Sequence, residues 1–363
     1  MTGVAVLGST GSIGCATLDV LRRHQDRFRL VALTAGSNQA ALDAQVAEWK
    51  PAYSKLANGS PHYLIEAATR PDADIVVNAV VGFAGLEATL AALKAGKRVA
   101  LANKESLVVA GELVERARVE GGGQLVPIDS EHSAVLQCLA GSPSPATRLI
   151  LTASGGPFRG WSADRVAAAS VEQALNHPTW RMGSKITVDS ATLANKAMEV
   201  IEGHFLFGLP YDAIDAVVHP QSIVHAFVEF ADGSVLAQMG FPSMELPILY
   251  ALTYPERVPD AGVRRFDPVA AGSLTFEPLR GDVFRAYTAG VAAGRAGGTA
   301  PAVFNAVNEV AVARFLEGRL AFGRIAEMIE AVLARHAVAR VNQLADVQAA
   351  DRWARLEAAK EIG

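Results

Sequence analysis

Three carboxylates of the sequence could together bind a metal ion and so support a metal-assisted reaction. Asp129 and Glu131 directly follow an apolar run, and Glu199 lies in a segment with helical spacing. A set of oxygen ligands without histidine or cysteine favours a hard ion such as Mg²⁺ or Mn²⁺. The alternative is a helix start, with Asp129 or Ser130 as the cap and Glu131 in the first turn. Spacing alone favours that simpler interpretation.

A glycine-rich segment near the start of the chain could hold a dinucleotide. Gly8-Ser-Thr-Gly11-Ser-Ile-Gly14 lies between an apolar run at Val4–Leu7 and helical spacing over Ile13–Arg23. Glycines there allow a tight turn and a close approach of pyrophosphate to the first N–H groups of the helix. The spacing is GxxGxxG rather than GxGxxG, and an ordinary strand–helix turn is the alternative. Its place in the first strand–helix unit favours cofactor binding.

The residues after the second expected strand bear on the choice between NAD and NADP. The segment is Thr34-Ala-Gly36-Ser37-Asn38, without an acid that could bind the ribose 2′-hydroxyl. This favours NADP, and Ser37 and Asn38 could donate hydrogen bonds to a 2′-phosphate. Either residue could equally serve only as a helix cap.

Several polar residues could surround a substrate and its anionic group. Lys104, between Asn103 and Glu105, follows an expected strand, so that it could face the nicotinamide and a substrate. The alternative is a helix N-terminus with Glu105 in its first turn. The following residues could hold an anion or close over it: Ser154, His177, Trp180, Ser190, Asn195 and Lys196. Asn195 and Glu199 are four residues apart and share a helix face. A solvated helix face and structural loop residues are the alternatives.

The expected elements would bring these residues to sheet edges. Strands are expected at Val4–Leu7, Phe28–Leu33, Asp74–Val81, Arg98–Ala102 and Gln124–Ile128, and helices at Ile13–Arg23, Asn38–Trp49, Leu86–Ala95 and Ser106–Glu120. This alternation predicts a parallel sheet covered on both faces, with ligands at the carboxyl ends of its strands. Residues 50–72 are not assigned.

The rest of the chain changes character after Asp129. A helix over Ser130–Leu139, a strand over Arg148–Thr152, a helix over Ala191–Phe207, and strands at Ala216–His219, Ile223–Phe230 and Ser234–Met239 predict an α+β domain with a partly antiparallel sheet. Residues 242–278 read as an aperiodic connection, and three or four helices follow Val283. The predicted fold class is therefore α/β, with a Rossmann-like domain at 1–128, an α+β catalytic domain at 129–247, a linker at 248–280 and a small helical domain at 281–363.

Composition limits the kind of protein. The chain has 363 residues, a formal net charge of −4 and two cysteines. Such a charge gives no general attraction to nucleic acid, and no apolar run is long enough for a membrane span. Two cysteines cannot form a disulfide framework, and no signal peptide is evident, so we expect a cytoplasmic protein.

Taken together and in order, seven motifs resemble one enzyme family. GSTGSIG, LANKES, PIDSEH, LTASGGPF, NHPTWRMG, VDSATLANKAMEV and HPQSIVH are similar to those of 1-deoxy-D-xylulose-5-phosphate reductoisomerases, and Asn305-Ala-Val-Asn308-Glu309 fits the helical tail. The resemblance implies a three-part homodimeric oxidoreductase of non-mevalonate isoprenoid synthesis. It would isomerise and reduce 1-deoxy-D-xylulose 5-phosphate to 2-C-methyl-D-erythritol 4-phosphate with NADPH and Mg²⁺, Mn²⁺ or Co²⁺.

The resemblance also assigns roles to residues of this sequence. The metal ligands would be Asp129, Glu131 and Glu199, and the catalytic residues Lys104, Glu131 and His177. The substrate would contact Lys104, Ser130, Glu131, Ser154, His177, Trp180, Ser190, Asn195, Lys196 and Glu199. The cofactor would contact Thr10, Gly11, Ser12, Ile13, Gly36, Ser37, Asn38, Asn103, Glu105 and Gly183.

The sequence departs from the family pattern at two places. Many members carry a basic residue where Ser37 stands, and the stretch between Trp49 and Asp74 is short for the family.

Two other functions are the alternatives. A semialdehyde dehydrogenase would need a cysteine nucleophile, but Cys138 lies in an expected apolar helix. A dinucleotide-sensing regulator with a decayed site would lack the carboxylates and lysine that are present here.

Overall fold

The chain forms two compact units in a computed structural model that describes residues 1–57, 59–142 and 144–361. Unit 1 comprises residues 1–106, 112–140 and 243–265, and unit 2 comprises residues 107–111, 141–242 and 266–363. Each unit has its own sheet. The predicted four-part division of the chain stays a prediction.

Unit 1 is built on a six-stranded parallel sheet. Its strands are β1 (Thr2–Leu7), β2 (Phe28–Ala35), β3 (Tyr53–Leu56), β4 (Ile75–Asn78), β5 (Arg98–Leu101) and β6 (Gln124–Pro127). They lie in the order β3-β2-β1-β4-β5-β6, which reverses direction between β1 and β4. Such a reversal leaves a crevice at the carboxyl ends of the strands, where α/β proteins bind ligands. The expected dinucleotide-binding fold class is confirmed.

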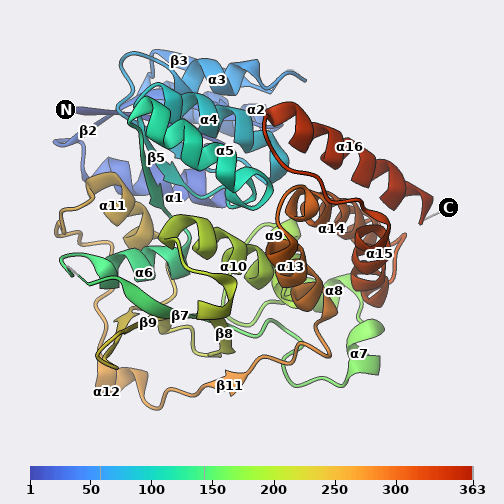
Figure 1. Cartoon of the computed structure of the whole chain (residues 1–363). Helices are drawn as coiled ribbons and strands as arrows, with labels where there is room; N and C mark the ends of the chain where they lie inside the picture. The colour runs from blue at the N-terminus through green and yellow to red at the C-terminus, as the bar shows by residue number, and fades with distance from the viewer. Residues whose placement is uncertain (58, 143, 362–363) are drawn as a thin grey trace. The chain divides into compact units, whose positions relative to one another are not determined.

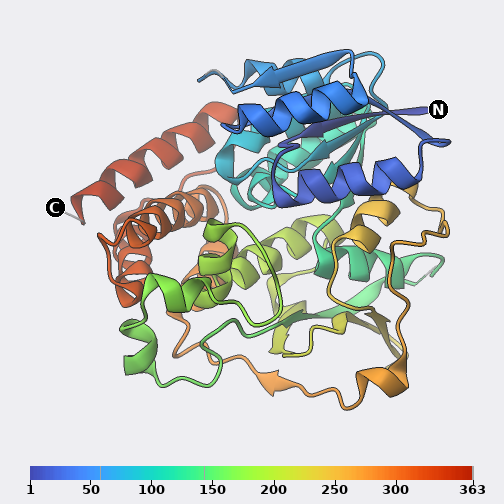
Figure 2. The ribbon, with the colours of Figure 1, turned by 180° about the vertical axis from the view of Figure 1, so that it is seen from behind.

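Helices cover both faces of this sheet. They are α1 (Ser12–Arg23), α2 (Gln39–Trp49), α3 (His62–Ala68), η1 (Gly82–Gly85), α4 (Leu86–Lys94), α5 (Glu105–Gly121), α6 (Ser130–Leu139) and α11 (Glu245–Thr253). The helices α4 and α5 stand in front in Figure 1, whereas α1 and α2 stand in front in Figure 2. Apolar strand residues such as Val4, Val6 and Val77 are fully buried between these layers, as expected for a doubly covered parallel sheet.

The register of the strands decides which residues meet. Leu7 of β1 pairs with Asn78 of β4, Asn78 with Leu101 of β5, and Leu101 with Pro127 of β6. The strands therefore end at one level, and the residues that follow them emerge side by side. This places the glycine segment after β1, Lys104 after β5 and Asp129 after β6 along a single edge.

Unit 2 contains a mixed sheet and the remaining described helices. Its strands are β7 (Ala146–Ala153), β8 (Ile214–Val218), β9 (Val224–Phe230), β10 (Val235–Met239) and β11 (Glu277–Pro278), in the order β10-β9-β7-β8-β11. Only β7 and β8 are parallel. The predicted hairpin turn at Ala231-Asp232-Gly233 joins β9 to β10, and Gly233 has φ 82°.

The helices of unit 2 fall into an early group and a C-terminal group. They are α7 (Ala163–Ala167), α8 (Val171–Leu175), α9 (Ser184–Thr192), α10 (Ala194–Phe207), η2 (Tyr211–Ala213), α12 (Pro268–Ala271), α13 (Arg285–Ala296), α14 (Ala300–Leu316), α15 (Phe322–Arg335) and α16 (Leu344–Lys360). The four helices α13 to α16 confirm the expected helical tail. No helix in the described part of the chain combines the length and apolar character needed to cross a bilayer.

Three sequence-based expectations were incomplete or wrong. The single helix predicted over Ala191–Phe207 is two helices, because Leu193 takes a left-handed conformation between α9 and α10. The connection expected over 242–278 contains α11, which buries Ile248, Leu249 and Leu252 in the core of unit 1. The unassigned residues 50–72 contain β3 and α3.

Candidate active site

The glycine segment forms a turn that leaves the start of α1 open. Gly8 has φ 80°, which other residues rarely adopt. A Cβ on Gly14 would overlap the backbone of Gly8 and Ser9, so glycine is required at both positions. Gly11 is the N-cap of α1 and offers no capping side chain. The first N–H groups of α1 can therefore receive an anion.

The side chain of Gln45, from α2, holds this turn in place and was not predicted from the sequence. The Ser9 hydroxyl, which is fully buried, donates to Oε1 of Gln45 over 2.7 Å. The Gln45 amide donates back to the Ser9 carbonyl over 3.0 Å. The contact spans 36 residues. No local sequence signal marks such a pair.

The segment after β2 supplies a helix cap and an exposed serine. Oδ1 of Asn38 accepts from the N–H of Ala41 over 3.1 Å, so the Asn38 side chain caps α2. Ser37 is exposed, and nothing lies within 4 Å of the position that a Cβ on Gly36 would take. Of the two polar residues predicted to read a 2′-phosphate, Ser37 has the freer side chain, because Asn38 serves as the cap.

Lys104 and Asp129 meet at the carboxyl edge of the sheet. Nζ of Lys104 lies 2.5 Å from Oδ2 of Asp129, and both side chains are largely buried. Nδ1 of His132, one turn into α6, lies 3.5 Å from Oδ1 of Asp129. His132 was not predicted from the sequence, although its place three residues after Asp129 puts it on the same side of a helix start.

Asp129 is held as a carboxylate. Burial alone would raise its pKa, but Lys104 and His132 together hold the pKa well below its usual range. Its Oδ1 atom is buried and, apart from the contact with Nδ1 of His132 at 3.5 Å, accepts no hydrogen bond within the described residues. The next side chains also converge here, since Ser130 donates to Oε2 of Glu131 over 2.5 Å. An unsatisfied, ionised carboxylate oxygen fits a cation ligand.

Asn103 organises the neighbouring loop. Its amide donates to the carbonyls of Val80 and Gly82, each over 2.8 Å, and to Oε2 of Glu105 over 3.1 Å. A Cβ on Gly85 would lie 2.5 Å from Oδ1 of Asn103. The side chain of Asn103 therefore shapes the loop after β4, which leaves its backbone as the part that could contact a cofactor.

In unit 2, three of the predicted phosphate ligands converge. Nε2 of His177 lies 3.0 Å from Oγ of Ser154 and 3.2 Å from Oγ of Ser190. Ser154 follows β7, and its Oγ also accepts from the N–H of Gly156 over 3.2 Å. Gly156 has φ 62° and packs against α9, because a Cβ there would lie 2.9 Å from the Ser190 carbonyl oxygen.

The hydrogen bonds of His177 fix its proton. Nδ1 of His177 accepts from the N–H groups of Thr179 and Trp180, over 3.1 and 2.9 Å. The proton of the neutral ring must then lie on Nε2, which donates toward the two serines. Burial lowers the pKa of His177 from its ordinary value of 6.5. The neutral ring is thus a hydrogen-bond donor at the centre of the cluster.

The predicted polar face of α10 is also present. Asn195 and Lys196 both donate to the carboxylate of Glu199. Nζ of Lys196 also donates to the Thr152 carbonyl of β7 over 2.5 Å. Lys196 and Glu199 are almost completely buried, so the alternative of a solvated helix face does not hold for them.

The loop before α9 carries the remaining predicted residues of unit 2. Gly183 is the N-cap of α9, and its carbonyl accepts from both the N–H and the hydroxyl of Thr187. Trp180 is half-buried. The side chains predicted to serve one active site are thus divided between the units: Lys104, Asp129 and Glu131 in unit 1, and Glu199 with the serine–histidine cluster in unit 2.

Comparison with known proteins decides the family. Family models match three stretches of the chain: 1-deoxy-D-xylulose 5-phosphate reductoisomerase at residues 4–111, its C-terminal domain at 125–207, and the DXP reductoisomerase C-terminal domain at 239–357. The reductoisomerase of Chlorobium chlorochromatii is 48% identical over 98% of each chain. The chain belongs to the 1-deoxy-D-xylulose 5-phosphate reductoisomerase family. The family and the reductoisomerase function implied by the seven motifs are confirmed.

Other relatives agree with this assignment. The reductoisomerase of Geobacillus kaustophilus is also 48% identical, over 98% of each chain. A crystal structure of DOX-P reductoisomerase with NADPH, fosmidomycin and magnesium has a TM-score of 0.94 and 38% identity, and covers 100% of this chain and 98% of its own. The enzyme of Zymomonas mobilis with NADPH has a TM-score of 0.91 and 40% identity, and covers 99% of each chain.

Proposed function

We propose that this protein converts 1-deoxy-D-xylulose 5-phosphate to 2-C-methyl-D-erythritol 4-phosphate with NADPH and a divalent ion. The observation that carries this proposal is the carboxyl edge of the parallel sheet. There the glycine turn, Lys104 and the ionised Asp129 follow strands β1, β5 and β6 that end at one level. A cofactor loop beside a lysine–carboxylate pair suits a metal-assisted reduction.

Asp129, Glu131 and Glu199 would hold the divalent ion. The buried and unsatisfied Oδ1 of Asp129 supports this assignment, and oxygen donors suit Mg²⁺, Mn²⁺ or Co²⁺ in this role. When bound, such an ion supplies a Lewis acid for the carbonyl and hydroxyl oxygens of the substrate. Relatives of known structure bind magnesium, which supports the metal class but not the choice among these ions.

The serine–histidine cluster of unit 2 would bind the substrate phosphate. The hydroxyls of Ser154 and Ser190 lie 3.0 and 3.2 Å from Nε2 of His177, and Asn195 and Lys196 add an amide and a positive charge. Trp180 would close the loop over the substrate. Binding energy from the phosphate then orients the distant reacting carbons.

Lys104, Ser130 and Glu131 would contact the oxygenated carbons of the substrate. Lys104 can donate a proton or a hydrogen bond to a substrate oxygen, and Glu131 can accept a proton. The NADPH would lie on the start of α1 and along the neighbouring loops, with these residues around it: Thr10, Gly11, Ser12, Ile13, Gly36, Ser37, Asn38, Asn103, Glu105 and Gly183. The open N-terminus of α1 supports the placement of the pyrophosphate.

A homodimer in the cytoplasm completes the proposal. The edge strand β10 exposes Val235, Leu236 and Met239. An exposed apolar edge strand invites pairing with another chain unless a partner covers it. This supports a second copy of the chain at β10.

The decisive experiment measures NADPH oxidation with deoxyxylulose phosphate, with and without divalent metal. We expect turnover only when both the substrate and the metal are present. Glu199→Gln should weaken the apparent affinity for metal, whereas Glu172→Gln, an exposed acid of α8, should not. Absence of metal-dependent turnover would refute the function, and unchanged metal affinity of Glu199→Gln would refute the ligand assignment.

A further inference from the structure

The corner between α9 and α10 is held in a conformation that its residues do not favour. Leu193 has φ 58° and ψ 13° and is 2% exposed. A residue with a Cβ is strained in the left-handed region. Such a conformation persists only where the surroundings enforce it, and this corner carries Ser190 on one side and Asn195 on the other.

Thr192 closes the corner from within. Its hydroxyl donates to the Asp189 carbonyl over 3.2 Å and accepts from the N–H of Ala194 over 3.3 Å. The hydroxyl therefore bridges the last turn of α9 and the first residue of α10. Thr192 is 5% exposed, so water does not readily replace these bonds.

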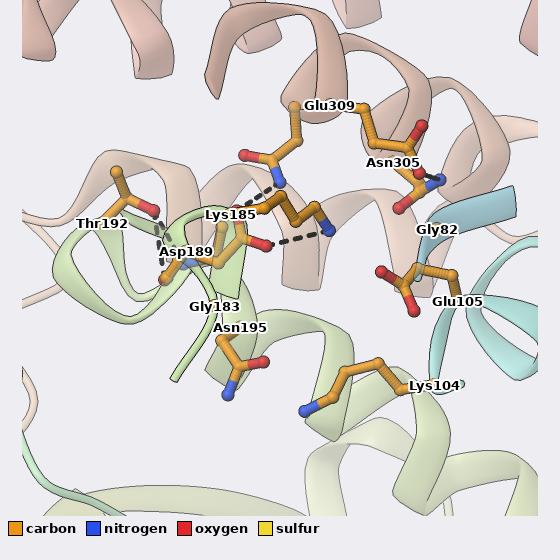
Figure 3. Close-up of polar contacts among 12 residues, drawn as sticks. Gly82, Lys104, Glu105, Gly183, Lys185, Asp189, Thr192, Asn195, Asn305 and Glu309 are labelled. Carbon is orange, nitrogen blue, oxygen red and sulfur yellow. Dashed lines mark hydrogen bonds and ion pairs between the residues drawn. The ribbon is translucent and has the colours of Figure 1, made fainter. Parts of the chain in front are cut away.

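The carboxylate of Asp189 connects this corner to a distant helix. Asp189 is 1% exposed, and Nδ2 of Asn308, from α14, donates to its Oδ1 over 2.7 Å. Nζ of Lys185, one turn earlier in α9, lies 2.9 Å from its Oδ2 (Figure 3). A buried carboxylate needs such partners. Asn308 is fully buried and lies 119 residues from Asp189.

Asp189 directly precedes Ser190, whose Oγ lies 3.2 Å from Nε2 of His177. The Gly156 turn already contacts the Ser190 carbonyl. The backbone at Ser190 is thus fixed through the glycine turn and through the contact with α14. A loss of the α14 contact would let Ser190 shift relative to Ser154 and His177.

We propose that Asn308 is a positioning residue for the phosphate subsite and acts through Asp189 on Ser190 and the Leu193 corner. Through Asn308, helix α14 of the C-terminal helices sets the affinity for the sugar phosphate without touching it. This inference rests on the proposed function, because it names the subsite that the C-terminal helices support.

The test uses Asn308→Leu in the full-length enzyme, which keeps the side-chain size and removes the donor. We expect the KM for deoxyxylulose phosphate to rise about tenfold, with kcat and the KM for NADPH nearly unchanged, as for a lost hydrogen bond to a charged group. The matched control is Asn305→Leu. Asn305 is equally buried on the same helix, but its amide donates to Glu309 over 3.0 Å.

A second pair of variants tests the corner, should Asn308→Leu fail to fold. Thr192→Val removes the bridging hydroxyl and should raise the same KM, whereas Thr192→Ser keeps the hydroxyl and should restore it. Wild-type KM in Asn308→Leu or in Thr192→Val, or an equal rise in Asn305→Leu, would overturn the proposal. If wild-type enzyme lacks metal-dependent turnover, the proposed function itself fails, so the two failures are distinguishable.

Discussion

At the scale of single residues, His177 is expected to control how the proposed phosphate cluster responds to pH. Its Nδ1 accepts two backbone N–H bonds, so protonation would break both. Burial lowers its pKa in the folded state below the ordinary value of 6.5. The folded state therefore binds this proton less readily than the unfolded chain, which means that the neutral ring stabilises the fold above about pH 6.5.

We expect this stabilisation to disappear as the pH falls through the lowered pKa. The melting temperature of the wild type should fall more steeply below pH 6.5 than that of His177→Gln. Thermal melts of both proteins between pH 5 and 8 measure the difference. Burial also lowers the pKa of His336, but this residue is present in both proteins, so its contribution to the pH dependence of the melting temperature is the same in both. Parallel melting profiles would contradict the buried neutral histidine.

In the proposed cofactor site, Ser37 is the residue expected to influence the preference for NADPH over NADH. Because the Asn38 side chain caps α2 and Ser37 is exposed, an arginine at 37 has room to reach a 2′-phosphate. Ser37→Arg should raise the ratio of kcat/KM for NADPH to that for NADH about tenfold, as a charge-assisted hydrogen bond would. Ala47→Arg adds the same charge near the other end of α2 and is the control. An unchanged ratio would show that position 37 does not read the phosphate.

At the scale of elements, the sequence predicted the helices and strands that have strong local signals. The strands and helices of unit 1 follow from apolar runs ended by glycine, as at Val4–Leu7 and Gly8. The break at Leu193 could not be predicted, because neither glycine nor proline marks it and the corner depends on Thr192 and Asp189. The helix α11 was missed because its surroundings are rich in proline, although it buries Ile248 in the core.

The contact between α2 and the glycine turn gives a prediction for cofactor binding. Gln45→Leu removes both hydrogen bonds to Ser9, so the turn should hold the pyrophosphate less well. We expect the KM for NADPH to rise about five- to tenfold while kcat changes little. Gln39→Leu is the control, since Gln39 is exposed on the same helix and bonds only Asp43 among the contacts described here. Steady-state kinetics at saturating sugar phosphate decide between these outcomes, and equal effects of both variants would contradict a specific role.

At the scale of the whole molecule, the residues of the proposed site were easier to predict than the distant residues that contact them. Asp129, Lys104 and His177 belong to ordered motifs, and the family resemblance of those motifs suggested their roles. Gln45 lies outside these motifs, and the motif that contains Asn308 did not indicate its partner, because Gln45 contacts Ser9 over 36 residues and Asn308 contacts Asp189 over 119 residues. Long-range contacts of this kind depend on how helices pack, which local sequence patterns do not encode.

The exposed strand β10 is where the proposed homodimer would form. Strand β10 lies at the edge of its sheet, and the side chains of Val235 and Leu236 are about half exposed. If a second copy of the chain covers this strand, a charge there must lose its hydration in the interface. Leu236→Lys should then weaken dimerisation at least about tenfold, which sedimentation velocity over a concentration series measures. Val338→Lys, at an equally exposed valine outside the sheet, controls for added surface charge. A Leu236→Lys protein that sediments like the wild type would place the dimer interface elsewhere, whereas a wild type that is monomeric at every concentration would exclude the homodimer.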